Sequence, residues 1–154
     1  MIKILFVCHG NICRSPMAEF IMKKLVKEQG KEKLYYIASA ATSREEIGSP
    51  VYPPAKRKLR QHGISCAGKT AVQMTKDDYA RYDYIIGMDN MNLRNILRII
   101  GSDPQKKVSL LLDFTEDPRS VADPWYTGDF DAAYNDIERG CRALIAQFSD
   151  YICC

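Results

Sequence analysis

The sequence lacks any long apolar run and any dense basic run. No segment approaches the roughly 18 apolar residues that a membrane-spanning helix needs. The formal net charge is only +3, and no run of five or more Lys or Arg occurs. These absences argue against a membrane protein and against a nucleic-acid-binding protein. The apolar stretch 2–7 is too short for a secretory signal, and a Cys-His-Gly turn follows it instead of a small-residue cleavage site. We therefore expect a cytoplasmic protein.

Histidine is scarce as well, and the cysteines lack the spacing of a zinc site. Only His9 and His62 occur, and no Cys-x-x-Cys pair exists, so a structural zinc ion is not expected. Six cysteines are present. In a chain of this size without a secretion signal, we expect reduced thiols rather than a disulfide framework. The cysteines are Cys8, Cys13, Cys66, Cys141, Cys153 and Cys154. We expect the last two to be frayed at the chain end.

The 154 residues fit one domain, expected to span residues 1–154, and no repeat or linker interrupts the pattern. Strands and helices are expected to alternate. The expected strands are 2–7, 34–40, 82–88 and 108–112. The first expected helix starts with Ser15 as N-cap and stops at Gly30. A second covers 55–62, and a short third starts with Thr75 as N-cap. The last two cover 90–100 and 130–149. This alternation favours an α/β fold with a parallel sheet and helices on both faces.

The turn from Cys8 to Ser15 contains the groups that phosphate capture and nucleophilic attack require. It joins a strand to a helix N-terminus, where backbone N–H groups and the helix dipole attract an anion. Gly10 and Asn11 tolerate unusual backbone angles. Arg14 can place a planar fork on two phosphoryl oxygens. In this field Cys8 should exist largely as the nucleophilic thiolate, with the Ser15 hydroxyl able to donate to its sulfur.

A Cys followed six positions later by an Arg is a weak signal alone. The preceding strand, the Gly and Asn inside the turn, and the Ser-Pro pair that opens a helix make it much stronger. The alternative is a structural turn around a buried cysteine.

Phosphoryl transfer to a thiolate also needs a proton donor for the leaving oxygen. Asp123 is the candidate, because it lies in a loop after the fourth expected strand, where a carboxyl can reach the strand ends. Pro124 stiffens this loop, and Trp125 and Tyr126 can supply aromatic walls. By composition alone an Asp-Pro pair is usually just a turn.

These motifs together resemble the low-molecular-weight protein tyrosine phosphatases, in the same order along nearly the whole chain. The matching segments are Phe6 to Glu19, Ser39 to Ser43, Ile47-Gly48, His62 to Ile64, Tyr82 to Ile86, Met88-Asp89 and Asp123 to Tyr126. The resemblance implies a three-layer α/β/α sandwich with a four-stranded parallel sheet and a phosphate loop after the first strand. It also implies that no metal or organic cofactor is needed.

The resemblance assigns roles to individual residues. Cys8 would be the nucleophile, Arg14 the phosphate-binding and transition-state-stabilising group, and Asp123 the general acid and then base. The phosphate and substrate site would be completed by His9, Gly10, Asn11, Ile12, Cys13, Ser15, Trp125 and Tyr126. The expected reaction is metal-independent hydrolysis of phosphotyrosine, in a protein or a small aryl phosphate, through a phosphocysteine, with inorganic phosphate as product.

Finer roles follow from the same resemblance. Asn11 would pin the loop by side-chain hydrogen bonds, and Ser15 would support the thiolate. Cys13 would form a reversible disulfide with Cys8 under oxidation. The alternative for Cys13 is a small packing residue.

The sequence departs from the family pattern at two places. Glu45 stands where many members have an aromatic residue at the pocket mouth, and Tyr52 is a possible substitute. A His that some members carry after the His-Gly-Ile element is missing, and Gly68 or Lys69 lies there. These departures leave the substrate preference open.

Three alternatives share the first loop. An arsenate reductase needs two further cysteines past the middle of the chain, and none lies between Cys66 and Cys141. A protein-arginine phosphatase typically carries Thr at the position of Ile12, whose apolar side chain suits an aromatic substrate better. An inactive phosphate-binding module would have no use for Cys8, Arg14 and Asp123 together.

Overall fold

The computed structural model describes residues 1–152, with side chains as far as Ser149. Cys153 and Cys154, for which fraying was predicted, lie outside the described residues. The strands are β1 (Ile2–Cys8), β2 (Tyr35–Ala41), β3 (Tyr84–Gly87) and β4 (Val108–Leu110). The helices are α1 (Arg14–Glu28), α2 (Pro53–Gln61), α3 (Asp78–Arg81), α4 (Asn90–Ile100), α5 (Pro124–Thr127) and α6 (Phe130–Ile152). Short 3₁₀ helices cover Glu32–Leu34 and Leu111–Phe114.

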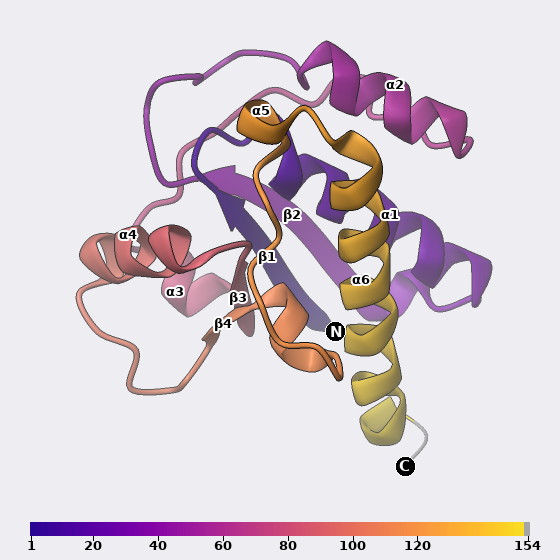
Figure 1. Ribbon diagram of the computed structural model, residues 1–154. Helices are drawn as coiled ribbons and strands as arrows, with labels where there is room; N and C mark the ends of the chain where they lie inside the picture. Colours follow the sequence, from indigo (N-terminus) through magenta and orange to yellow (C-terminus); the bar gives the residue numbers. More distant parts are fainter. Residues whose placement is uncertain (153–154) are drawn as a thin grey trace.

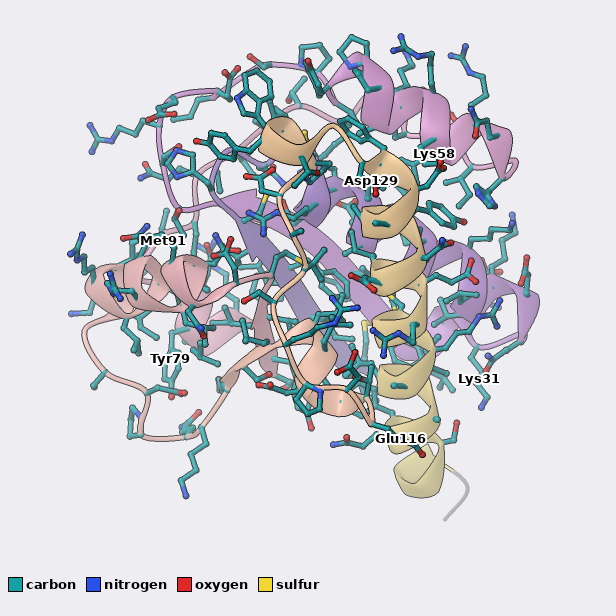
Figure 2. All side chains as sticks on the ribbon, in the orientation of Figure 1. Lys31, Lys58, Tyr79, Met91, Glu116 and Asp129 are labelled. Atoms are coloured by element: carbon teal, nitrogen blue, oxygen red, sulfur yellow. The ribbon has the colours of Figure 1, made fainter. Side chains whose placement is uncertain are left out.

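The strands form a four-stranded parallel sheet in the order β2-β1-β3-β4, with helices on both sides (Figure 1). Ile4 and Phe6 of β1 pack with α1 and α6, whereas Leu5 and Val7 pack in a second cluster that includes Ile96 of α4. Both faces of β1 are therefore buried from residue 4 to residue 8, which agrees with the continuous apolar run over residues 4–7. Figure 2 shows side chains of the two helical layers, with Met91 of α4 and Lys31, which follows α1, on opposite sides of the sheet. The predicted α/β/α fold is confirmed.

Two predicted helix starts are wrong. Helix α1 begins at Arg14, after Cys13, so Ser15 lies inside the first turn instead of capping it. Its hydroxyl points to the Cys8 sulfur rather than to the helix backbone. Helix α3 begins at Asp78, and the Thr75 N–H donates to the Asp78 carboxylate at 2.8 Å. Asp78 therefore stabilises a turn before the helix, so the helix starts later than predicted.

Other boundaries also differ from the prediction. Strand β4 ends at Leu110, because the Leu110 N–H donates to the Asp113 carboxylate at 3.1 Å and the chain turns into a 3₁₀ helix. Pro124–Thr127, predicted as loop, forms the short helix α5. Among residues 1–152, no helix has the length and apolar character required to cross a membrane.

The carboxyl ends of β1 and β3 lie side by side, since Val7 pairs with Gly87. A Cβ atom at Gly87 would lie 3.1 Å from Asn92 Cβ and 3.3 Å from Leu93 Cδ2, so glycine lets α4 start close against the strand end. Figure 1 shows α5 at the same end of the sheet, where β1 terminates. Three segments distant in sequence thus meet where ligands bind in open parallel sheets.

Candidate active site

The loop between β1 and α1 is held in shape by the buried side chain of Asn11. Its backbone has φ +57°, in the left-handed region that Asn tolerates better than most residues. The side-chain amide donates to Ser15 Oγ at 2.7 Å and to Ser39 Oγ at 3.0 Å, and its carbonyl accepts from the Val72 N–H at 3.2 Å. Asn11 therefore ties the loop to α1, to β2 and to the 72–74 segment beside β2.

The sulfur of Cys8 lies at the N-terminus of the fifteen-residue helix α1. Ser15 Oγ lies 3.0 Å from it, and the Ser15 N–H donates to it at 3.4 Å. The Ser15 oxygen accepts from the Asn11 amide, and its own proton can go to the sulfur or to the carbonyl oxygen of Ala40, 3.5 Å away. A sulfur at this position lies within reach of the Ser15 hydroxyl and the Ser15 N–H, at the positive end of the helix dipole.

The guanidinium of Arg14 is buried directly behind the pocket. Nη1 donates to Asp89 Oδ2 and to the carbonyl oxygen of Val121, each at 2.8 Å, and Nη2 lies 3.3 Å from Asp123 Oδ2. The side chain is only 3% exposed. Arg14 is therefore fixed from three directions, and it still presents N–H donors that these contacts do not use.

Sequence reasoning gave no role to Asp89, although this residue lies in one of the matching segments. Asp89 is the N-cap of α4: its Oδ1 accepts from the Asn92 N–H at 2.8 Å while its Oδ2 accepts from Arg14. The only signal in the sequence was its position just after a parallel strand, next to the loop that follows β1. Asp89 positions the cation of the site.

Asp123 lies where the sequence predicted a proton donor. Its Oδ1 accepts from the Trp125 N–H at 3.0 Å as the N-cap of α5, and its Oδ2 contacts Arg14. The side chain is about one quarter exposed, at 25%. The carboxyl group is thus held at the pocket and remains accessible to a substrate.

A pocket of about 220 Å³ opens above Cys8 and brings together most of the predicted site. It is lined by Cys8, His9, Gly10, Ile12, Cys13, Arg14, Glu45, Glu46, Asp123, Trp125 and Tyr126. Asn11 and Ser15 lie behind this lining and support the loop. Trp125 and Tyr126 are 52% and 84% exposed, which makes them the outer wall of the pocket.

The pocket mouth carries charge at Glu45, the position where the resemblance in sequence led us to expect an aromatic ring. Glu45 Oε2 lies 3.0 Å from His9 Nε2, so the two side chains pair across the rim. Tyr52 does not line the pocket in the described structure. Its ring instead packs on Trp125 with a centroid distance of 4.8 Å, which supports the outer wall.

Cys13 lies in the same pocket as Cys8 but in a different electrostatic setting. It is 5% exposed. Burial, and secondarily the charge of Cys8, raise the pKa of Cys13 to about 12. Cys13 is therefore a neutral thiol at ordinary pH.

Lys69 belongs to a buried polar network behind the loop. Lys69 Nζ donates to the carbonyl oxygen of Ser39 at 2.9 Å and lies 3.7 Å from Glu19 Oε1. Glu19 accepts from Ser39 Oγ at 2.6 Å, and Ser39 Oγ accepts from Asn11. Burial lowers the pKa of Lys69, and the Glu19 carboxylate opposes this shift. The network links Lys69 to the phosphate loop.

A thiol at a helix N-terminus, a fixed guanidinium and a carboxyl group thus meet in one pocket. The family described as low molecular weight phosphotyrosine protein phosphatase matches residues 3–151. The chain is 40% identical to the low molecular weight protein-tyrosine-phosphatase YfkJ of Bacillus subtilis, over 95% of each chain. It is also 40% identical to the human low molecular weight phosphotyrosine protein phosphatase, over 92% of each chain.

Solved structures agree with this similarity. The crystal structure of Bacillus subtilis YfkJ superposes with a TM-score of 0.93 at 39% identity, covering 98% of this chain and 96% of that one. The crystal structure of DARP, a drosophila arginine phosphatase, gives a TM-score of 0.85 at 30% identity, covering 96% and 98%. The chain belongs to the low molecular weight phosphotyrosine protein phosphatases. It is therefore a hydrolase of phosphoric monoesters.

We predict that Asp89→Asn lowers kcat/KM on para-nitrophenyl phosphate by roughly 10- to 100-fold, the worth of one charge-assisted hydrogen bond. Asparagine is a good N-cap, so the start of α4 should survive. Its single side-chain oxygen cannot serve both Arg14 and the Asn92 N–H. Steady-state kinetics and a thermal unfolding curve measure the two effects separately.

The matched control is Asp113→Asn, which changes a carboxylate that caps a backbone N–H but does not line the pocket. This variant should keep its activity. Equal losses in the two variants, or an Asp89→Asn loss explained wholly by unfolding, would contradict the positioning role.

Proposed function

We propose that the protein hydrolyses phosphotyrosine, in proteins or in small aryl phosphates, through a phosphocysteine intermediate on Cys8. The observation that carries this proposal is the meeting of three groups in one pocket. The Cys8 sulfur is hydrogen-bonded to the Ser15 hydroxyl, and the Arg14 guanidinium is held by Asp89. The Asp123 carboxyl contacts that guanidinium. A phosphoryl group entering the pocket would reach all three.

The first step transfers the phosphoryl group. The Cys8 thiolate forms a sulfur–phosphorus bond as the bond from phosphorus to the phenol oxygen breaks, and Asp123 gives its proton to that oxygen. Arg14 and the loop N–H groups hold the equatorial phosphoryl oxygens, over which the transition-state charge spreads.

The second step frees the enzyme. Asp123, now a carboxylate, takes a proton from water as the water oxygen attacks phosphorus. The sulfur–phosphorus bond breaks, inorganic phosphate leaves, and Cys8 returns to the thiolate form. Because the same carboxyl serves as acid and then as base, it must stay at the pocket in both steps. Its role as N-cap of α5 supports this.

Replacing the nucleophile and the acid should give two distinct kinetic signatures. Cys8→Ser should lower turnover below roughly one thousandth, because serine is not ionised in this site. Asp123→Asn keeps the α5 cap but cannot donate the proton, so hydrolysis of phenyl phosphate should fall by about 10²- to 10⁴-fold. Hydrolysis of para-nitrophenyl phosphate, whose leaving group needs less help, should fall far less.

These assays are run with EDTA present. Retained turnover in Cys8→Ser, or equal losses of Asp123→Asn on the two esters, would show that the roles are wrong. Activity abolished by the chelator would contradict the metal-independent mechanism.

The substrate test compares phosphotyrosine with phosphoarginine. DARP is an arginine phosphatase of similar structure, so the fold alone does not decide between the two. Ile12 lines the pocket here and adds an apolar wall suited to an aromatic ring. We predict a kcat/KM at least about tenfold higher for a phosphotyrosine peptide than for the matched phosphoarginine peptide.

Two variants refine the comparison. Ile12→Thr places a hydroxyl on the apolar wall and should lower the ratio of kcat/KM for the phosphotyrosine peptide to kcat/KM for the phosphoarginine peptide. Ile12→Val keeps the wall apolar and should preserve this ratio. A parent enzyme that prefers phosphoarginine would overturn the substrate assignment.

Cys13 supports a second proposal, that Cys8 is protected during oxidation. Peroxide would oxidise the Cys8 thiolate to a sulfenic acid. The Cys13 sulfur would then displace hydroxide, so that a disulfide and water form. The shared pocket and the influence of Cys8 on the Cys13 pKa support their proximity.

We therefore expect peroxide inactivation to be reversed by dithiothreitol in the parent enzyme and to become largely irreversible in Cys13→Ser. Cys66→Ser, another buried cysteine outside the pocket, is the control and should behave like the parent. Equal recovery in Cys13→Ser would refute the protective disulfide.

A further inference from the structure

A groove of about 910 Å³ runs along the free edge of β2 and shares no lining residue with the pocket above Cys8. Strand β2 is an edge strand, because the sheet order places β1 on one side of it and no strand on the other. One wall of the groove comes from α1, with Phe20 and Lys27, and the opposite wall from the end of α3, with Arg81 and Tyr82.

The outward backbone groups of β2 follow from its hydrogen bonds. The Thr42 N–H donates to the Cys8 carbonyl in β1, whereas the Ala41 N–H donates outward to the carbonyl of Val72 at 2.7 Å. With the two-residue period of a strand, the backbone groups of Ile37 and Ser39 also face away from β1. The outward backbone of β2 is thus hydrogen-bonded to the 72–74 segment at Ala41. From there toward Ile37, no strand pairs with this edge.

The partners at this edge differ along its length. Lys69 Nζ donates a hydrogen bond to the outward carbonyl oxygen of Ser39. Within the part of the chain that the structure describes, the outward N–H and carbonyl of Ile37 have no hydrogen-bond partner. An unpaired N–H and C=O on an edge strand form a template for another extended chain.

The side chains of the groove add charge and apolar surface. Five basic and three acidic residues line it: Lys23, Lys24, Lys27, Lys69 and Arg81 against Glu19, Glu32 and Asp78. Glu19 is buried and pairs with both Lys23 and Lys69, and Asp78 pairs with Arg81 at 3.6 Å, which leaves the lining with an excess of two positive charges, five basic against three acidic residues. Tyr36 is 52% exposed beside the ring of Tyr82. The groove therefore favours an anionic chain with some apolar side chains.

We propose that this groove is a docking site for an extended acidic peptide segment of a partner protein, which adds as a strand beside β2. Backbone hydrogen bonds at Ile37 would give affinity, and the basic walls would select acidic side chains. This recognition lies apart from the phosphate pocket and goes beyond the proposed hydrolysis. A nucleic acid could meet the positive charge but has no peptide groups to continue the sheet.

The binding test uses a short fluorescein-labelled peptide of alternating glutamate and valine, titrated against the full-length enzyme by fluorescence anisotropy. We expect saturable binding that a lysine–valine peptide of the same length does not show. Methylating alternate backbone nitrogens of the acidic peptide should abolish binding, because it removes the donors that pair with the strand. In NMR hydrogen exchange, the peptide should slow the amide of Ile37.

Variants locate the site. Lys27→Glu with Arg81→Glu reverses one exposed charge on each wall and should weaken the acidic peptide by roughly tenfold or more, with kcat/KM on para-nitrophenyl phosphate unchanged. The matched control, Arg98→Glu with Lys106→Glu, reverses two exposed charges outside the groove and should bind like the parent.

Several outcomes would overturn the proposal. They are no binding of the acidic peptide, equal binding of the methylated peptide, unaltered exchange at Ile37, or equal losses in the two double variants. Displacement of the peptide by heparin without any protection of Ile37 would indicate a nonspecific polyanion surface instead. None of these outcomes bears on the chemistry at Cys8, so the two proposals fail independently.

Discussion

The buried guanidinium of Arg14 connects three segments that the chain order keeps far apart. Arg14 is the first residue of α1, directly after the phosphate loop. Its guanidinium donates hydrogen bonds to Asp89 after β3, and to Val121 and Asp123 in the segment that follows β4. A buried cation is costly unless it is paired and hydrogen-bonded, and here the pairing partners are themselves fixed as helix N-caps. The requirement to satisfy one buried charge thus fixes the positions of Arg14, Asp89 and Asp123 relative to one another.

A second polar network stands behind the loop and restrains its backbone. Asn11 joins Ser15 to Ser39, and Ser39 donates to Glu19, whose carboxylate also pairs with Lys23 and Lys69. Each member of this network has a partner, which is the condition for a buried network to stabilise rather than weaken a fold. Lys69 extends this network to the carbonyl oxygen of Ser39 on β2.

Much of this arrangement could be predicted from the sequence, because it depends on local patterns. The apolar run before Cys8, the Gly and Asn in the turn, and the order of strands and helices gave the parallel sheet and the place of the loop. The late start of α3 and the early end of β4 could not be predicted, because each depends on one carboxylate, Asp78 or Asp113, accepting a hydrogen bond from a particular backbone N–H. Asp89 was missed for a related reason: only the fold shows that one oxygen caps α4 while the other meets Arg14. The His9–Glu45 pair likewise depends on two loops approaching each other.

The central claim is that Cys8 carries the phosphoryl group during turnover. The direct measurement is rapid acid quenching of the Asp123→Asn enzyme during hydrolysis of para-nitrophenyl phosphate, followed by mass spectrometry of the peptide that contains Cys8. In this variant the second step lacks its base, so the phosphocysteine should accumulate. The account predicts phosphate on Cys8, present only while substrate remains. Phosphate on another residue, or an unmodified Cys8 peptide during active turnover with a burst of nitrophenol, would contradict it.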